Sequence, residues 1–448
     1  MWGFTVDDAL IAVRYAHDVA TGVGYRFDPQ GPSTDGVTPL PWTFLLVPFA
    51  RADDALATLF SAKLVGVVAW GVAGAQLGGH LARLRPTPAW VAALALVLMA
   101  LAFPIGAWAA SGMETGLATA IATIAATKTH RPRYAAILAG LAASLRPEMV
   151  VWAVALASMS ALASATREDA AANRGVIAKT MATAGAIAAG PFVLCAAIRL
   201  AVFGRAAPLA LLAKPSDLSH GAIYGAAATL VLLLPLLAFA PLAIARSGGP
   251  ARVIAIAFVA HIVAVITAGG DWMPYARLVV PVAPSLVIVI ASSAAHSSRA
   301  LVVARAGVAC VLGIYLVVRA APAGRHVGAD RRALVTSARA VLASSKVVAT
   351  LDIGWVSAAT NARIVDLAGL TDPSIASLPG GHTSKRVDVS MLLDRDVDTF
   401  LAYEDANGAL RAAEVRIVRT ALFEARFDRA TTLPLGDAGA RYVVYRRR

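Results

Sequence analysis

The chain has 448 residues, of which 58% are hydrophobic and only 15% are charged, and its mean hydropathy is +0.69. Soluble domains are about 45–50% apolar and about 25% charged. The apolar excess therefore excludes an ordinary soluble enzyme and predicts a polytopic α-helical membrane protein. The formal net charge is +13. Much of this excess lies in short loops between apolar runs, where membrane topology accounts for it, so no nucleic-acid partner is expected.

Ten apolar runs predict about ten membrane spans. They lie near residues 55–79, 89–110, 116–127, 134–145, 149–163, 180–203, 223–245, 253–268, 278–293 and 300–319. The runs 116–127, 134–145 and 149–163 are shorter than the roughly 20 residues that a helix needs to cross the hydrocarbon. Short or broken helices are tolerated beside protein or a water-filled cavity. We therefore expect a cavity next to these three runs.

The basic residues between the runs predict the orientation. They cluster in alternate loops, at Arg83 and Arg85, at Lys128, Arg131 and Arg133, at Arg167, Arg174 and Lys179, at Arg246 and Arg252, and at Arg299 and Arg305. The positive-inside rule makes this face cytoplasmic. Ten crossings would then leave both ends outside a multi-pass protein of the inner (plasma) membrane. Because Met1 would start outside without a preceding span, we expect that the natural start lies upstream and that one helix is missing.

Charge density predicts two domains. Residues 1–319 hold 22 Lys and Arg and 13 Asp and Glu, whereas the much shorter segment 320–448 holds 18 and 14. We predict a transmembrane domain over 1–319 and a soluble, extracytoplasmic α/β domain over 320–448. Strands are expected at 346–351, 363–367 and 441–445, and helical spacing is present at 330–343 and 409–420.

An adjacent acid pair begins the first expected helix. Asp7 and Asp8 precede Arg14 and Tyr15, and a Gly- and Pro-rich loop containing Asp35 follows. Adjacent carboxylates on one helix point about 100° apart. One can therefore face a cavity while the other caps, pairs or holds an ion. A plain N-cap pair is the alternative.

Further ionisable residues stand at the predicted outer ends of apolar runs. Glu114 follows one run, Arg146 and Glu148 flank the helix breaker Pro147, and Asp271, Trp272 and Arg277 join two others. Ionisable residues at membrane depth indicate function by default, although an internal Arg146–Glu pair that locks the helices is the alternative. A carboxylate can act as general base for a hydroxyl, and arginines can hold a phosphate. Since nucleotide sugars are absent outside the cell, a lipid-linked sugar is the natural donor there.

Several segments resemble a known family when they are taken in order. They are Asp7-Asp8-Ala9-Leu10-Ile11 with Arg14-Tyr15-Ala16, Gly22-Val23-Gly24, Asp35 to Trp42, Ser111 to Thr115, Arg146-Pro147-Glu148, Gly269 to Pro274, Asp352-Ile353-Gly354-Trp355 and Asp366 to Pro373. This order resembles the GT-C superfamily of glycosyltransferases, and within it the mycobacterial terminal arabinofuranosyltransferase (AftB-like) group. The span that normally precedes the acid pair in this family is absent from the sequence.

The resemblance implies a GT-C membrane fold and an inverting transfer of a sugar from a polyprenyl-phosphate donor. It implies that Asp7 or Asp8 is the catalytic base, with Asp7 favoured, and that Arg146 and Arg277 bind the donor phosphate. The remaining candidates would orient the substrate: Arg14, Tyr15, Asp35, Glu114, Glu148, Asp271 and Trp272. No metal ligands are assigned, and a divalent metal beside the acid pair stays open.

The expected partners are a polyprenyl-phosphate sugar, a glycan or glycoconjugate acceptor of the cell wall or cell envelope, and the lipid bilayer. Arabinofuranose is the candidate sugar, and the donor sugar stays open. Two alternatives remain: a transporter or flippase for a lipid-linked or anionic substrate, and a non-catalytic glycan-binding membrane protein. The enzyme hypothesis requires the Asp7–Asp8 pair to meet Arg146, Glu114 and Asp271 at the non-cytosolic membrane boundary.

Overall fold

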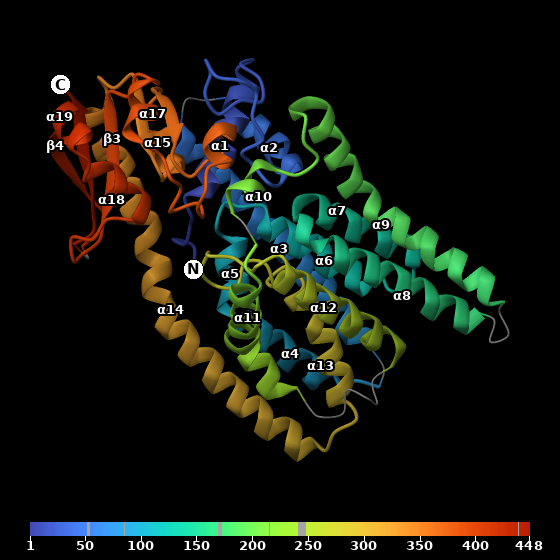
Figure 1. The fold of residues 1–448 in the computed structure, drawn as a ribbon. Helices are drawn as coiled ribbons and strands as arrows, with labels where there is room; N and C mark the ends of the chain where they lie inside the picture. The colour runs from blue at the N-terminus through green and yellow to red at the C-terminus, as the bar shows by residue number, and fades with distance from the viewer. Residues whose placement is uncertain (52–53, 85, 169–172, 215, 241–247, 438) are drawn as a thin grey trace. The chain divides into compact units, whose positions relative to one another are not determined.

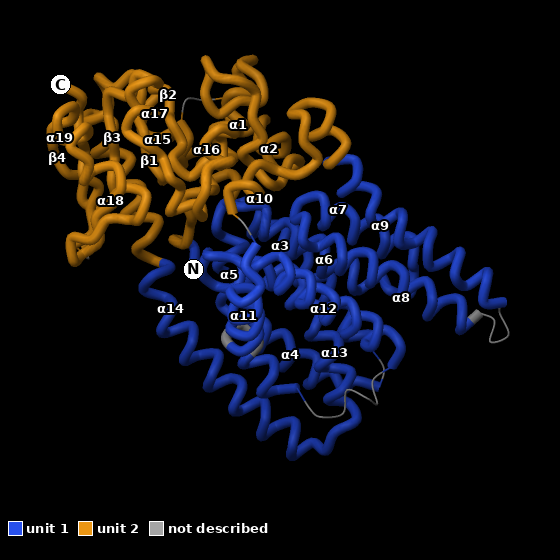
Figure 2. Tube along the Cα trace, viewed as in Figure 1, with its two compact units in different colours: residues 1–2, 63–195, 216–324 blue, residues 3–62, 196–215, 325–448 orange. Residues whose placement is uncertain are grey.

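The computed structural model describes residues 1–51, 54–84, 86–168, 173–214, 216–240, 248–437 and 439–448 (Figure 1). Arg85, Arg246 and the end of the apolar run 223–245 lie outside the described residues. The chain groups into two compact units, shown in Figure 2. Unit 1 comprises residues 1–2, 63–195 and 216–324, and unit 2 comprises residues 3–62, 196–215 and 325–448.

The predicted division at residues 319 and 320 falls inside one long helix, α14 (Arg299–Leu342). The C-terminal residues group with residues 3–62 and with the end of α9 (Arg174–Phe203). The acid pair at Asp7 and Asp8 therefore belongs to the same compact unit as the C-terminal sheet. A functional division into 1–319 and 320–448 stays a prediction.

Each apolar run overlaps helical structure, although the described residues 278–282 at the start of the run 278–293 are turns. In order, the described elements are α3 (Ala55–Arg83), α4 (Ala89–Leu101) with α5 (Phe103–Ala109), α6 (Thr115–Thr127), α7 (Pro132–Leu145), η2 (Pro147–Met149) with α8 (Val150–Glu168), α9, α11 (Leu218–Phe239), α12 (Gly249–Thr267), η4 (Ala283–Ser285) with α13 (Leu286–Ala294), and α14. Within unit 1, α7 packs against α6 and α8, and α8 packs against α12. Small residues also allow a close approach between α7 and α9: a Cβ added to Gly140 would lie 2.7 Å from the carbonyl oxygen of Ala188.

Fewer helices meet the length and hydropathy of a membrane span than the ten predicted crossings. Among the described residues five do so, or six if the pair α4 and α5, bent by 63°, forms one span. The prediction that 149–163 is too short was wrong. The helical segment Pro147–Arg167 has 21 residues because it continues past the apolar run into Thr166 and Arg167. The helices α6 and α7 are short, with 13 and 14 residues.

Unit 2 is built on a sheet whose strand order is β2-β1-β3-β5-β4. Strand β1 (Val347–Thr350) runs parallel to β2 (Arg363–Asp366) and to β3 (Thr399–Glu404). Strand β5 (Arg441–Arg447) pairs antiparallel with β3 and with β4 (Phe427–Pro434). Helices of this unit are α1 (Asp8–Ala20), α2 (Leu40–Leu46) with η1 (Val47–Phe49), α10 (Leu209–Ala213), α15 (Ile353–Ala359), α16 (Pro373–Ala376), α17 (Val389–Leu393), α18 (Ala412–Val418) and α19 (Ala421–Arg426).

The apolar faces of these elements form the core of unit 2. Val348, Phe400 and Val444, from three neighbouring strands, are fully buried. The apolar side of α1, which includes Ala9 and Ala16, is buried as well, and α1 packs against α15. This packing brings the first helix of the chain to a segment that follows more than 300 residues later. It thereby sets the position of the acid pair.

Candidate functional site

The carboxylate of Asp7 is held by the N-terminal turn of α15. The backbone N–H of Gly354 donates to Asp7 Oδ2 at 2.7 Å, and that of Trp355 donates to Oδ1 at 2.9 Å. Arg331 Nη1 lies 3.4 Å from Oδ1, and the Asp7 side chain is 16% exposed. Asp7 makes no side-chain capping bond to its own helix, so the plain N-cap alternative does not describe it. It binds instead the free N–H groups of another helix.

Glycine is required at position 354 for this contact. A Cβ added there would lie 2.1 Å from the carbonyl oxygen of Asp7 and 2.7 Å from its Oδ2. A side chain would therefore displace Asp7. The segment Asp352-Ile353-Gly354-Trp355 begins α15, and its glycine lets the Asp7 carboxylate come close to the helix backbone.

A second carboxylate, Asp352, lies beside Asp7 at the start of α15. Arg411 binds both of its oxygens, with one distance of 3.1 Å, and Tyr442 Oη donates to Oδ2 at 2.6 Å. Burial raises the pKa of Asp7 to about 6 against the opposing charge of Arg331. Burial acts in the same direction on Asp352, but Arg411 and Tyr442 hold the pKa of Asp352 below its usual value. The two carboxyl groups therefore titrate apart although both are buried.

Asp8 differs from both of these carboxylates. It is partly exposed, and within the described part of the chain its side chain has no hydrogen-bond or ion-pair partner. The adjacent acids thus have the two separate orientations that helical geometry predicts: Asp7 is anchored and Asp8 is left with both oxygens available.

The other candidates of unit 2 contact residues of their own chain. Arg14 Nε lies 3.3 Å from Asp18 Oδ2 on the next turn of α1. The hydroxyl of the buried Tyr15 hydrogen-bonds Thr34 Oγ1 at 2.8 Å and accepts the N–H of Gly36 at 3.1 Å, so it fixes the loop that follows α1.

Asp35 pairs with an arginine that the sequence analysis missed. Arg199 Nε donates to Asp35 Oδ2 at 2.6 Å, and both side chains are buried. Burial raises the pKa of Asp35, and Arg199 opposes this rise. The signal was present in the sequence, since Arg199 is an ionisable residue inside the apolar run 180–203, which is a position that is expensive without a partner.

In unit 1, Arg146 lies between two glutamates. Its Nη1 donates to Glu114 Oε1 at 2.7 Å, and its Nε donates to Glu148 Oε1 at 2.7 Å. The backbone of Arg146 is extended, with φ −138° and ψ 96°, which places it at the break between α7 and η2 that Pro147 predicts. The internal Arg146–Glu pair, kept as an alternative in the sequence analysis, is the arrangement in the structure. The second oxygen of Glu114 is buried and accepts no hydrogen bond among the described residues.

The loop between α12 and η4 carries the other charged pair of unit 1. Arg277 Nε donates to Asp271 Oδ2 at 2.7 Å, and the guanidinium lies 5.9 Å from the ring centre of Trp108. Tyr275 and Ala276 have φ of 59° and 52°, a region that side chains disfavour. The bond from Trp108 Nε1 to the carbonyl oxygen of Tyr275, at 3.0 Å, fixes this backbone. Strained backbone of this kind is concentrated at functional sites.

Trp272, in the same loop, is largely on the surface. Its side chain is 68% exposed, and its ring stacks on His220 with ring centres 4.1 Å apart. An exposed ring supported from behind can bind a flat apolar face such as that of a sugar. It can equally serve as an anchor at a membrane boundary.

The candidates thus fall into two groups, each assembled within one unit. Asp7, Asp8, Arg14, Tyr15 and Asp35 belong to unit 2. The residues of unit 1 are Glu114, Arg146, Glu148, Asp271, Trp272 and Arg277. The convergence of the two groups on one pocket stays a prediction. No cluster of three or more His, Cys, Asp or Glu side chains able to hold a metal ion is present among the described residues.

Comparison with known proteins identifies the fold. Residues 326–445 match the family described as "Domain of unknown function (DUF8728)". No curated protein matches the sequence. The structure is similar to the crystal structure of ArnT from Cupriavidus metallidurans in the apo state, with a TM-score of 0.57 and 12% identity over 98% of this chain and 93% of that chain. ArnT is a GT-C glycosyltransferase. The protein therefore has a GT-C-type, multi-pass α-helical membrane fold with a small C-terminal sheet domain.

Proposed function

We propose that the protein is a GT-C glycosyltransferase that moves a sugar from a polyprenyl-phosphate donor to a hydroxyl group of a cell-envelope glycan or glycoconjugate. We place the reaction on the extracytoplasmic face of the inner membrane, with inversion at the anomeric carbon and arabinofuranose as the candidate sugar. The fold supports this class of enzyme. Asp8 carries the proposal, because its carboxylate has no partner among the described residues and stands beside Asp7, which the chain holds in place.

The reaction needs a base and a leaving group. The acceptor oxygen attacks the anomeric carbon, its proton passes to a carboxylate, and the bond from the sugar to the phosphate oxygen breaks to release polyprenyl phosphate. Asp8 suits the role of base, since both of its oxygens are available to a hydroxyl. Asp7 suits a positioning role, because two N–H groups and Arg331 already bind it. This assignment reverses the preference for Asp7 drawn from the family resemblance.

The cluster of unit 1 supplies the proposed donor site. The ion pair of Arg277 uses its Nε, so its two terminal amino groups remain for a phosphate. Arg146 is bound by two glutamates and would have to share its donors with the phosphate. We therefore assign the phosphate first to Arg277 and second to Arg146. The buried Glu114 Oε2, which lacks a donor, suits a sugar hydroxyl, and Glu148 and Asp271 orient the two arginines.

Two single substitutions test the proposal. Purified full-length protein would be incubated with decaprenyl-phospho-arabinofuranose, with other polyprenyl-phosphate sugars and with an acceptor oligosaccharide. Asp8→Asn is expected to lower transfer by about 10²–10⁴-fold, the usual contribution of a general base, with no change in melting temperature. Asp394→Asn is the matched control, because Asp394 is exposed in the same unit and lies outside the proposed site. Full transfer by Asp8→Asn would refute the assignment of the base.

The same assay separates the alternatives from the proposal. A transporter or flippase moves the lipid-linked sugar without breaking its bond to phosphate, and a glycan-binding protein leaves it unchanged. Release of free polyprenyl phosphate that depends on the acceptor therefore supports the enzyme. Its absence with every donor, in protein whose melting temperature shows it to be folded, would contradict the proposal.

A further inference from the structure

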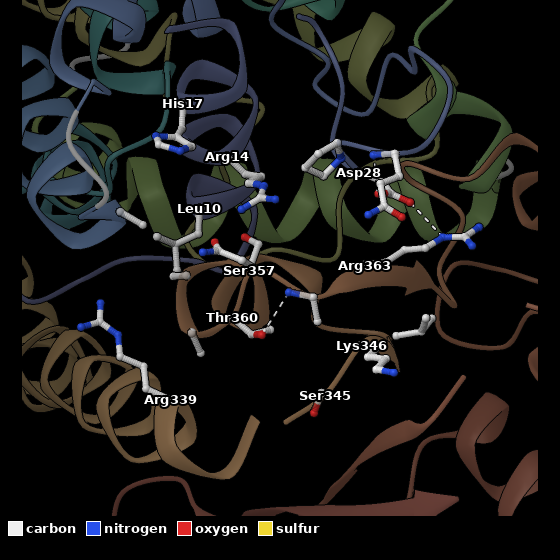
Figure 3. A pocket seen from close by; sticks show the side chains of 18 of the residues that line it. Leu10, Arg14, His17, Asp28, Arg339, Ser345, Lys346, Ser357, Thr360 and Arg363 are labelled. Carbon is white, nitrogen blue, oxygen red and sulfur yellow. Dashed lines mark hydrogen bonds and ion pairs between the residues drawn. The ribbon is translucent and has the colours of Figure 1, made fainter. Parts of the chain in front are cut away.

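A large cavity in unit 2 lies apart from the acid pair. It has a volume of about 850 Å³, within the range of about 300–1,000 Å³ typical of ligand pockets. One face of α1 lines it through Leu10, Val13, Arg14 and His17 (Figure 3). Other parts of its wall come from the loop after α1, the end of α14, the start of β1, and residues 357–363 after and within α15. Neither Asp7 nor Asp8 lines it.

Cations from separate elements face this cavity. Arg339 at the end of α14 and Lys346 before β1 are exposed, and their charged groups have no ion-pair or hydrogen-bond partner among the described residues. Arg14 reaches it from α1, with a side chain that is only 10% exposed and an Nε that lies 3.3 Å from Asp18 Oδ2. Arg363 pairs with Asp28 at 2.9 Å on the same wall, as the dashed line in Figure 3 shows.

Helix electrostatics explain only part of this arrangement. Arg339 lies in the last turn of α14, where a cation is favoured by the helix dipole. Lys346, however, lies beyond that helix, and Arg14 lies in the middle of α1. Two exposed cations without partners among the described residues, next to a third held in the wall, make the cavity suited to an anion.

The remaining lining residues narrow the class of ligand. Gln30, Asn361 and Thr360 offer amide and hydroxyl groups that match sugar hydroxyls. No Phe, Tyr or Trp is among the described residues of the lining, so an aromatic platform for a neutral sugar is not part of it. The apolar side chains Leu10 and Val13 are each only 1% exposed, which leaves little surface for an acyl chain.

We propose that this cavity binds an anionic oligosaccharide, with its carboxylate or phosphate groups held by Arg14, Arg339 and Lys346 and its hydroxyl groups by Gln30 and Asn361. The inference goes beyond the proposed transfer reaction and does not depend on it. It gives the C-terminal part of the chain a binding site of its own, with walls completed by the N-terminal helix α1.

Direct binding tests the proposal without any donor lipid. Full-length protein in detergent would be titrated by calorimetry with tetragalacturonate as the anionic probe and with maltotetraose as the neutral one. We expect binding of tetragalacturonate that weakens as salt is raised, because the Debye length falls to about 8 Å at 0.15 M. Maltotetraose is expected to bind at least tenfold more weakly. No binding of tetragalacturonate at low salt, or equal binding of the two probes, would overturn the proposal.

Charge reversal locates the site. Arg339→Glu with Lys346→Glu is expected to weaken tetragalacturonate binding at least tenfold. The control is Arg419→Glu with Arg426→Glu, which changes the net charge equally at two exposed positions of unit 2 outside the cavity. The control should bind within twofold of the original protein, and melting temperatures report folding of both variants. Equal affinity of the two variants would refute the site.

A parallel experiment with lipid vesicles tests whether the bound anion is instead a lipid headgroup. The same variants would be mixed with phosphatidylglycerol vesicles. If charge reversal in the cavity abolished vesicle binding and left tetragalacturonate binding intact, a lipid headgroup would be the ligand and the oligosaccharide proposal would be wrong. Unchanged vesicle binding together with lost tetragalacturonate binding supports it.

Discussion

The two units stabilise their buried charged groups in different ways. In unit 1, Arg146 and Arg277 are matched by Glu114, Glu148 and Asp271, so charge is balanced by charge. In unit 2, Asp7 is bound both by backbone N–H groups at a helix start and by Arg331 at 3.4 Å. Only in the second arrangement does an adjacent carboxylate, Asp8, remain without a partner among the described residues.

This difference bears on which group meets the substrate first. A buried ion pair needs no ligand, and removing one member leaves an uncompensated charge. A phosphate that binds Arg146 must therefore compete with two glutamates. A hydroxyl that approaches Asp8 has no competitor. We therefore expect substitutions in the Arg146 cluster of unit 1 to lower mainly stability. Substitution of Asp8 in unit 2 should lower mainly activity.

The largest effect is expected from Arg146→Met in unit 1. It leaves Glu114 and Glu148 buried without their cation, and breaking a buried pair in this way costs about 3–5 kcal/mol. The melting temperature in detergent should fall sharply, and the triple variant Arg146→Met, Glu114→Gln, Glu148→Gln should recover most of the loss. A single variant as stable as the original protein would break the comparison, since it would show that the cluster does not support the fold.

Gly354→Ala should act on activity through Asp7. The added Cβ would lie 2.1 Å from the Asp7 carbonyl oxygen, so the start of α1 must shift. A displacement of about 1 Å at a reacting group can cost about 100-fold in rate, which is the expected loss of transfer. The control is Gly381→Ala, where the added Cβ would lie 3.6 Å from its nearest atom, an ordinary van der Waals distance. If Gly354→Ala kept full activity, Asp7 would not need its present position.

Tyr442→Phe should have a smaller effect in the same unit. It removes the hydroxyl that donates to Asp352 Oδ2 at 2.6 Å, and a hydrogen bond to a charged group contributes about 1.5–3 kcal/mol. We expect a lower melting temperature and a transfer rate reduced by less than tenfold. Tyr445→Phe is the matched control, because no hydrogen bond of its hydroxyl supports the sheet among the described residues. Equal melting temperatures for the two variants would contradict a role for the Asp352 network.

The smallest expected effect is a dependence of stability on pH. Burial raises the pKa of Asp7 from 3.8 to about 6. Between these values the folded protein binds more protons than the unfolded chain, so the contribution of Asp7 to stability falls as pH rises through this window. Asp7→Asn should flatten this part of the plot of melting temperature against pH. An unchanged slope would show that other groups set it.

The helices were predictable because apolar runs report burial or lipid exposure directly. Within the described residues all ten runs overlap helical structure, and the break at Pro147 was anticipated. The number of spans was not predictable, because a run shows composition and not whether its helix crosses a bilayer. The break at Ala102, where α4 ends and α5 begins at a bend of 63°, left no mark in the hydropathy of the run 89–110.

The sheet was predicted in part. The expected strands at 346–351, 363–367 and 441–445 are confirmed by β1, β2 and β5. Strands β3 and β4 were missed. Strand β4 lies at the sheet edge and is mostly exposed, so its sequence does not alternate, and the buried Phe400-Leu401-Ala402 of β3 is too short a run to stand out between charged neighbours.

The partners of the acid pair were beyond sequence reasoning. The pair itself was found from two adjacent carboxylates at a helix start. Arg331 lies 324 positions from Asp7, in a tail where many arginines look alike. Arg411 and Tyr442, which bind the neighbouring Asp352, carry no distinguishing sequence signal either. One sequence shows which groups need partners, but long-range pairing depends on how α1 packs against α15.

The contact between Asp7 and the N–H groups of Gly354 and Trp355 also orders events during biosynthesis. The ribosome makes Asp7 more than 300 residues before its partners, which follow only after most of the apolar helices. Until then the N–H groups that bind the Asp7 carboxylate are not present. A nascent chain, or one truncated before α15, therefore lacks this contact. The contact between α15 and the start of α1 can therefore form only late in synthesis.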